Sequence, residues 1–529
     1  MSRRTWTLVA VVLASGIVFL DGTVVNVALP TIQRELPATF VAPLEGVTYV
    51  NSGYLAVLAA LLILAGAVND YYGRRRMFRL GLIGFGASSV ACGLAPTMEL
   101  LILARLVQGA FGALLVPGSL SIISATFEGE ERGRAVGIWA AATSATTTLG
   151  PIVGGFLVQS LSWRIAFLIN VPLVIVALYA TAAGVDESRD DEATGRFDWL
   201  GAAVIAIGVG GLAFGATRGQ EQEWADPVAW ASLIVGAVAT VAFPILMATR
   251  PNPLVPLDLF KSRNFSVVNL STFVIYGALY VSFTFQGLYL QGTLGYSPTA
   301  AGAVGIPTGV MLTFLSTPAG RLSARWGPRL FMTIGPFLMA LGLIWLARIP
   351  ASSEPWLADP RDPATLVPSS GVWIDVLPGL VVFGLGLALL VAPLTTTLLS
   401  SLPVRRAGLG SAINNAVSRV GSPLVSAVLF IAITASFYPA LQSRVPDADV
   451  NDPAFREQVQ PLTPPGEGLE SVMEDAAREA STDAFHLAML VAAALLLAGA
   501  AINGFGIRNP RPVEAAREDV TGEAAGTGS

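Results

Sequence analysis

The sequence is poor in cysteine, histidine, lysine and charged residues in general. Its 529 residues include one cysteine, Cys92, and one histidine, His486, and only 13% are Asp, Glu, Lys or Arg. A single cysteine excludes a disulfide framework, and so few Cys and His residues argue against a metal cluster. The only lysine, Lys261, has no glycine-rich loop before it, which excludes the phosphate-binding loop of ATP-driven pumps. We therefore expect no metal, no cofactor and no ATP hydrolysis by this chain.

Hydrophobic residues, in contrast, make up 53% of the chain and form long uncharged runs from end to end. This pattern is typical of a polytopic membrane protein whose main partner is the lipid bilayer. The pattern leaves no room for an appended catalytic domain, and no nucleophile–histidine arrangement is visible, so we expect neither an enzyme nor a nucleic-acid partner. The first run, after Ser2, resembles a signal peptide but is too long and lacks a small-residue cleavage site, which predicts a retained helix.

Cutting the apolar runs at charges and at Pro/Gly clusters gives about fourteen membrane-spanning helices, so the fold class is all-α. They are expected at residues 6–30, 46–69, 77–95, 98–124, 134–160, 163–184, 197–217, 227–249, 265–290, 299–323, 329–348, 372–399, 406–436 and 483–506. Arginines concentrate on the loops that share a side with the N-terminus, such as Arg74 to Arg79. By the positive-inside rule, both termini are predicted in the cytoplasm and the helices in the inner membrane.

The segment from Gly66 to Arg74 recurs, with its glycines and basic residues at the same offsets, from Gly320 to Arg329. A duplicated six-helix half explains this echo. We therefore expect two pseudo-symmetric six-helix bundles with two inserted linker helices. The predicted parts are a first half at 1–190, a linker pair at 191–262, a second half at 263–508 with a long external loop at 437–482, and a disordered cytoplasmic tail at 509–529. We expect that loop to be a solvated linker, with a short surface helix at residues 469–484 as the alternative.

Asp21 stands inside the first apolar run, at membrane depth. A carboxylate there costs roughly 2.5–3.5 kcal/mol on insertion scales and is seldom found without a partner, a proton or a cargo. Arg105 lies about eight residues from the outer end of its predicted helix and Asp21 about nine from Pro30, so at 1.5 Å per residue their depths agree. We expect them to form a proton-coupling pair, because an arginine stays charged and can hold or release a neighbouring carboxylate's proton. The alternative is a purely structural buried pair.

Asp70 is predicted at the cytoplasmic end of the second helix, where the thirteenth helix begins near Arg406. A carboxylate at a helix N-terminus is stabilised by about 0.3–1 kcal/mol. We therefore expect Gly66, Asp70, Gly73 and Arg74 to form a conformational latch between the halves. The alternative is a tight turn whose arginines only fix the topology.

Two further sets of polar and aromatic residues fall inside apolar runs. In the ninth helix, residues spaced three or four apart predict a face that looks into the bundle, where aromatic rings would suit flat apolar or cationic cargo; helix packing with an outer aromatic belt is the alternative. In the thirteenth helix, an amide pair and an arginine mark either the cavity or structural pairing. These candidates are Phe273, Tyr276, Tyr280, Phe283 and Gln286, and then Asn414, Asn415 and Arg419. The isolated His486 is interpreted as an interfacial residue.

Four motifs together resemble the major facilitator superfamily, and within it the fourteen-helix drug:proton antiporter branch. They are Asp21 to Pro30, the Gly66 to Arg74 loop, Arg105 to Gly109, and the run containing Gly150, Pro151, Gly154 and Gly155. The chain departs from the family patterns at Tyr71, which replaces a basic residue, and at Thr146, which replaces a glycine. In the last motif, small residues permit close helix packing and the proline kinks the helix, which predicts a bending point. The resemblance also places Asn26 and Gln108 in a substrate cavity.

The resemblance implies a monomeric exporter that works by alternating access and exchanges protons for small, largely apolar or cationic molecules such as drugs or antibiotics. A sodium gradient remains an alternative energy source. Within transport, the rival is an exporter of a specific lipid or of a metabolite that the cell itself makes. From another class, the rival is a membrane sensor that transports nothing.

Overall fold

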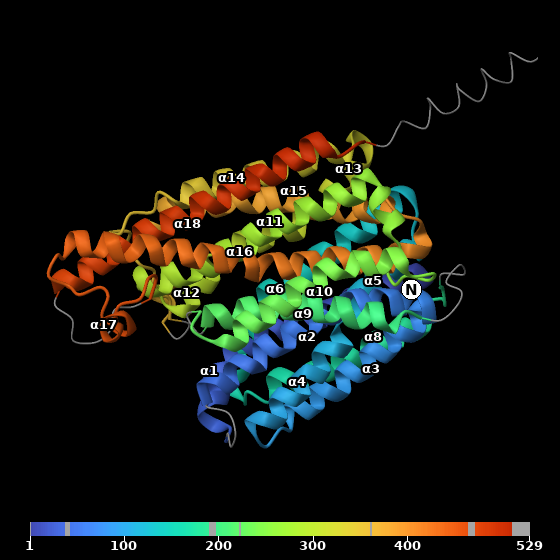
Figure 1. Ribbon diagram of the computed structural model, residues 1–529, viewed down its shortest axis with the longest axis horizontal. Helices are drawn as coiled ribbons and strands as arrows, with labels where there is room; N and C mark the ends of the chain where they lie inside the picture. Colours follow the sequence, from blue (N-terminus) through green and yellow to red (C-terminus); the bar gives the residue numbers. More distant parts are fainter. Residues whose placement is uncertain are drawn as a thin grey trace, which may run out of the picture.

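The computed structural model describes residues 2–37, 43–189, 197–221, 224–359, 362–463 and 471–509. Within these ranges the regular elements are helices, so the all-α prediction is confirmed (Figure 1). The principal helices are α1 (Arg3–Glu35), α2 (Pro43–Tyr72), α3 (Arg74–Gly93), α4 (Met98–Gly112), α5 (Leu115–Thr126), α6 (Gly129–Ser160), α7 (Ile165–Leu168), α8 (Asn170–Gly184), α9 (Trp199–Glu221), α10 (Pro227–Thr249), α11 (Arg263–Leu288), α12 (Pro298–Ala303), α13 (Ile306–Trp326), α14 (Pro328–Leu346), α15 (Leu377–Ser400), α16 (Ala407–Arg444), α17 (Pro453–Gln458) and α18 (Ser471–Gly506).

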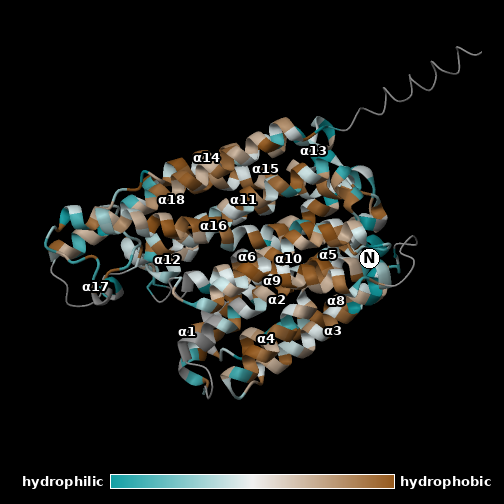
Figure 2. Cartoon of the chain, in the orientation of Figure 1, coloured by the Kyte–Doolittle hydropathy of each residue, from teal (hydrophilic) through white to brown (hydrophobic). Residues whose placement is uncertain are grey.

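Twelve helical segments of the described chain are long and apolar enough to cross a membrane. Some of these segments combine shorter elements, such as α4 with α5 and α7 with α8. Two further helices, α3 and α6, are 20 and 32 residues long and carry several charges in their first turns. With them the described part of the chain holds fourteen long helical segments, at the positions of the fourteen predicted spans. Figure 2 shows hydrophobic residues along the middles of the helices and hydrophilic residues at their ends.

The long loop predicted at 437–482 is shorter in the structure. Helix α16 continues to Arg444 and α18 already begins at Ser471, so residues 471–484 form the start of a spanning helix rather than a separate surface helix. Arg444 joins the end of α16 to the start of α18, because its guanidinium contacts Glu479 at 3.0 Å and Asp483 at 2.6 Å. Hydropathy alone places helix ends at the limits of the apolar run. Helices α16 and α18 extend beyond these limits, and polar side chains hold the two extensions together. Residues 510–529, where the disordered tail is predicted, lie outside the described residues.

Helices α1 to α8 pack mainly on one another, as do α11 to α18, and these are called here the first and second sets. The sets meet where α2 packs on α16 and where α6 packs on α13. We call the end of the bundle that carries residue 2, the turn at Gly73 and the turn at Gly327 the terminus end. In Figure 1 this end lies at the right, and the two sets diverge from it toward the left.

Helices α9 and α10 form a hairpin whose first member lies against both α2 and α16. At the hairpin turn Arg218 pairs with Asp226 and also reaches the Tyr49 hydroxyl of α2. The backbone N–H of Val228 and the Arg218 guanidinium hold the pKa of Asp226 below its ordinary value. These contacts attach the hairpin to the first set of helices.

Candidate functional site

Asp21 lies in the middle of α1 and is fully buried. Its Oδ2 pairs with Nη1 of Arg105 in α4, which is also fully buried. The guanidinium is held from α2 as well, since Arg105 Nε donates to the carbonyl of Val50 at 3.0 Å and its Cζ lies 3.9 Å from the ring centre of Tyr54. Asp21 and Arg105, which are predicted to lie at the same depth, therefore meet where α1, α2 and α4 come together.

The second carboxylate oxygen of Asp21 accepts from two side-chain amides. Gln108 Nε2 lies 3.1 Å and Asn170 Nδ2 lies 2.9 Å from Oδ1. Both amides also donate to Ser89 Oγ, at 2.7 and 3.2 Å, and Gln108 Oε1 accepts from Arg105 Nη1 at 2.7 Å. The result is a polar cluster, the Asp21 cluster, that joins α1, α3, α4 and α8. A buried charge is tolerated only with this kind of pairing and hydrogen bonding.

Ser89 and Asn170 are members of the Asp21 cluster that the sequence analysis missed. Asn170 is an amide within the apolar run of α8, and this was the one available signal, because an amide in hydrocarbon needs a partner. Gln108, which the resemblance places in a substrate cavity, has its fully buried side chain in the Asp21 cluster. Asn26 lies in α1, but its side chain is outside the described part of the structure.

Asp70 lies at the terminus end of α2 and contacts the second set of helices. Its Oδ2 accepts the backbone N–H of Leu409, in the first turn of α16, at 2.9 Å. Its Oδ1 accepts from Arg74 Nε at 2.9 Å and from Ser121 Oγ at 3.2 Å. Arg74 in turn donates to the carbonyl of Val404 at 2.9 Å. One ion pair in the first set thus holds both a helix N-terminus and a loop of the second set, which is the placement expected of a latch.

Two glycines give this contact its geometry. A Cβ on Gly66 would clash with Ala412 and lie 2.7 Å from the carbonyl oxygen of Gly408, so only a glycine lets α2 approach α16 this closely. Gly73 has a φ of +105°, in the left-handed region that favours glycine. The turn it forms allows Glu187 to accept the N–H groups of Arg75 and Arg76, at 3.0 and 3.1 Å, at the start of α3.

Gly150 and Gly154 of the motif that also contains Pro151 and Gly155 lie in α6 and face α1 near Asp21. A Cβ on Gly150 would overlap Thr23, and a Cβ on Gly154 would lie 3.1 Å from Cα of Val24. Helix α6 is assigned as a single helix through Pro151. Pro151 and Gly155 belong to α6, but their surroundings are outside what the structure describes.

The aromatic residues predicted on one face of α11 do not share one environment. The rings of Tyr276 and Tyr280 lie 6.1 Å apart and are half-buried, Gln286 is buried, and Phe283 is 40% exposed with its ring 5.6 Å from Phe383. Phe273 is half-buried, and its carbonyl lies against Gly421 of α16. Part of the predicted stripe therefore serves helix packing.

The polar candidate residues of α16 also lie in different surroundings. Asn414 donates to Asn269 at 3.2 Å and to Thr272 at 2.8 Å, and Asn415 donates to the carbonyl of Ser411 at 2.9 Å. Arg419 instead reaches α1, where its Cζ lies 5.9 Å from the ring centre of Phe19. The asparagines thus make contacts within the second set, whereas Arg419 lies between the two sets.

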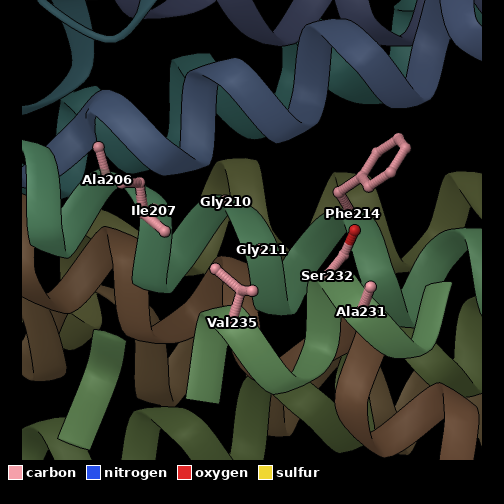
Figure 3. Close-up of a pocket in the computed structure, with 8 residues that line it drawn as sticks. All are labelled: Ala206, Ile207, Gly210, Gly211, Phe214, Ala231, Ser232 and Val235. Carbon is pink, nitrogen blue, oxygen red and sulfur yellow. The ribbon is translucent and has the colours of Figure 1, made fainter. Parts of the chain in front are cut away.

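A groove of about 550 Å³ lies between α9 and α10 (Figure 3). It is lined by Ala206, Ile207, Gly210, Gly211, Phe214, Ala231, Ser232 and Val235. None of these side chains is ionisable, and none was a candidate site residue. We do not place the cargo site there.

Comparison with known proteins gives matches along most of the chain. A sequence model of the Major Facilitator Superfamily matches residues 11–426. The multidrug resistance protein Stp of Mycobacterium tuberculosis (strain CDC 1551 / Oshkosh) is 32% identical over 83% of this chain and 79% of that protein. The tetracenomycin C resistance and export protein of Streptomyces glaucescens is 30% identical over 99% and 96%. The puromycin resistance protein pur8 of Streptomyces alboniger is 33% identical over 81% of each.

Two solved structures show the same fold at low identity. The human organic anion transporter MFSD10 aligns with a TM-score of 0.58 at 13% identity, over 95% of this chain and all (100%) of that one. The proton:xylose symporter XylE aligns with a TM-score of 0.56 at 17% identity, over 93% and 95%.

Proposed function

The chain belongs to the major facilitator superfamily of membrane transporters, and on this premise we propose that it exports small, largely apolar or cationic molecules such as drugs or antibiotics in exchange for protons. The relatives named for multidrug, tetracenomycin C and puromycin resistance support export as the direction. The observation that carries proton exchange is Asp21, a carboxylate buried at mid-helix and paired with Arg105. A protonatable group at this depth is the simplest device by which an ion gradient can drive cargo.

We propose that residues 1–190 and 263–508 move as two bodies, with the α9–α10 hairpin carried by the first. We place the protein in the inner membrane, with the terminus end in the cytoplasm because the arginines concentrate at that end. The conformation described, with Asp70 bonded to Leu409, is then the one whose cytoplasmic side is closed. Alternating access requires the latch to release and the opposite ends of the bodies to approach.

Protonation of Asp21 has a direct structural consequence in the Asp21 cluster. The carboxylate in α1 loses its charge, while Arg105 keeps its own charge and its bonds to Val50 and to Gln108. The strongest tie between α1 and α4 is thereby weakened, and α1 becomes freer to shift against α2 and α4. Gly150 and Gly154 allow α1 and α6 to stay closely packed beside this site. Proton uptake and a change of access are coupled in this way.

The test uses proteoliposomes that contain only this protein, with an imposed pH gradient and ethidium as a fluorescent apolar cation. Wild type should accumulate ethidium against its concentration gradient. Asp21→Asn should insert normally but show no uphill transport. Asp186→Asn, which removes an exposed carboxylate paired with Arg3, is the matched control and should behave as wild type. Uphill transport by Asp21→Asn would refute the proposal, and transport driven by a sodium gradient alone would replace protons with sodium.

A second candidate function is export of one metabolite that the cell itself makes. It is favoured by the relative named for tetracenomycin C export, which matches 99% of this chain and 96% of its own length. The same vesicles decide between the candidates, because a multidrug exporter moves several unrelated molecules and a dedicated exporter moves one class. A sensor would move none.

A further inference from the structure

Asn170 stands at a break between two helices of one spanning segment. Helix α7 ends at Leu168 and α8 begins at Asn170, two residues before Pro172. Proline has no N–H to donate to the carbonyl four residues earlier, here that of Leu168, while Ile169 between the two helices keeps helical backbone angles. The fully buried Asn170 side chain lies against Asp21 of α1 and Ser89 of α3.

The two ends of the Asn170 amide are used unequally. Nδ2 has two protons to donate, and it makes two contacts, with Asp21 Oδ1 at 2.9 Å and Ser89 Oγ at 3.2 Å. Oδ1 is buried and has no hydrogen-bond partner among the described residues. This arrangement suits an ionised carboxylate, which can only accept. It does not suit a protonated Asp21, whose O–H must find an acceptor.

Rotation of the amide by half a turn exchanges the two ends. Oδ1 would then face the O–H of a protonated Asp21 and the hydroxyl of Ser89, and both could donate to it. Gln108 would keep its own contact with Ser89, because that contact places Nε2 as donor and Oγ as acceptor. The other titratable groups around the carboxylate are Arg105 from α4, whose ring neighbour is Tyr54 of α2, and Cys92 of α3, which lies 3.6 Å from Gln108 Oε1.

We infer that Asn170 is a positioning residue that hydrogen-bonds Asp21 in both of its protonation states, as donor to the carboxylate and, after rotation of its amide, as acceptor from the carboxylic acid. Ser89 takes part in both arrangements, as acceptor in the first and as donor in the second. The inference rests on the proposed function, because it requires that Asp21 takes up a proton. It assigns to α8 a part in the proton cycle that the pair Asp21–Arg105 alone does not have.

The test is infrared difference spectroscopy of the purified protein, low pH minus high pH, with asparagine side chains labelled with ¹³C. Wild type should show the carbonyl band of a newly protonated Asp21 together with a shift of one asparagine carbonyl to lower wavenumber, because that oxygen gains hydrogen bonds. Asp21→Asn should lose both features. Asn170→Leu should lose the asparagine shift and move the Asp21 band to higher wavenumber, because its O–H has lost its acceptor.

Two more variants make the result independent of one substitution. Asn503→Leu is the matched control, since Asn503 is buried in α18 and far along the chain from Asp21. Its Nδ2 donates to the Met332 carbonyl, and its Oδ1 has no hydrogen-bond partner within the part of the chain that the structure describes. Its spectrum should equal that of wild type. Ser89→Ala, which retains nearly the same volume, should keep the Asp21 band and reduce the asparagine shift.

The outcomes separate the two proposals. If the Asp21 band is present in wild type and the asparagine carbonyl does not shift, Asn170 is a fixed donor and the inference is overturned while proton exchange stands. The same holds if Asn170→Leu folds and leaves both features unchanged. If the wild-type spectrum equals that of Asp21→Asn, Asp21 takes up no proton, and the proposed coupling fails first.

Discussion

The carboxylate of Asp21 is held by three side chains that come from two helices other than its own. Arg105 and Gln108 project from α4, and Asn170 projects from α8. Removing one partner from a buried ion pair costs about 3–5 kcal/mol, because the remaining charge has no compensation. The cluster therefore stabilises the packing of α1 as long as Asp21 is charged, and this is the property that a proton can change.

Arg105→Leu should lower the free energy of unfolding by about 3–5 kcal/mol, since it leaves Asp21 charged and unpaired. The double variant Asp21→Leu, Arg105→Leu should recover most of that loss, because no buried charge is left without a partner. Thermal unfolding in detergent measures both. Arg3→Leu is the control, since it breaks an exposed pair in which both side chains are about two-thirds exposed (67% and 71%), and pairs of that kind contribute little. A double variant as unstable as the single one would show that the charge is not the cause.

At the scale of helices, the depth of Asp21 and Arg105 could be predicted by counting residues from the helix ends, because the rise per residue of an α-helix is fixed. The meeting of Asp70 with the start of α16 could be predicted for the same reason. Asn170 and Ser89 could not, because nothing in one sequence says which faces of α3 and α8 turn toward α1. The true ends of α16 and α18 were also missed, since polar contacts such as Arg444 with Glu479 extend helices beyond the apolar run.

Asp70→Asn should reduce transport while leaving cargo binding in detergent within about twofold of wild type. The change removes the ion pair with Arg74 and weakens the bond to the N-terminus of α16, so it shifts the equilibrium between access states without touching the Asp21 cluster. Transport rate and cargo Kd are measured on the same preparation. Glu131→Gln, in an exposed pair with Arg4 within the first set at the same end, serves as the control. A loss of binding as large as the loss of transport would contradict a latch.

Gly154→Leu should stop transport of every cargo alike. A Cβ at this position already lies 3.1 Å from Val24 Cα, so a leucine side chain has no room between α6 and α1. Initial rates for several unrelated cargos in proteoliposomes test this, with the protein's folded fraction checked by size-exclusion chromatography. Loss of one cargo with retention of the others would make α6 a specificity element instead.

For the molecule as a whole, the two sets approach each other closely at the terminus end. Besides the Asp70 latch, α6 meets α13 there: a Cβ on Gly320 would lie 3.1 Å from the carbonyl oxygen of Gly133, and one on Gly137 would lie 2.8 Å from Cα of Thr317. Glycines on facing helices let the backbones touch, which gives a tight but separable contact. The internal echo between Gly66–Arg74 and Gly320–Arg329 predicts that both sets contribute such a turn. The second copy has Ala324 in place of the acid, so it offers no carboxylate for a matching contact.

A disulfide between Gly133→Cys and Gly320→Cys, placed in a Cys92→Ser background, should abolish transport by holding the terminus end closed. Reduction should restore it. The two backbones lie close at these positions, since a Cβ on Gly133 would lie 3.5 Å from the carbonyl oxygen of Gly320 and one on Gly320 would lie 3.1 Å from that of Gly133. The single-cysteine variants under the same oxidant are the controls. Full transport by the cross-linked protein would contradict opening at this end.

The central claim is that Asp21 exchanges a proton for cargo. The most direct measurement is proton release on addition of cargo to the purified protein in weakly buffered detergent solution, at one protein concentration, for wild type and for Asp21→Asn. The account predicts that wild type releases protons as cargo binds, and that Asp21→Asn binds the same cargo and releases none, because an amide has no proton to exchange in this range. Equal proton release by the two proteins would contradict the account and leave Asp21 as a structural partner of Arg105.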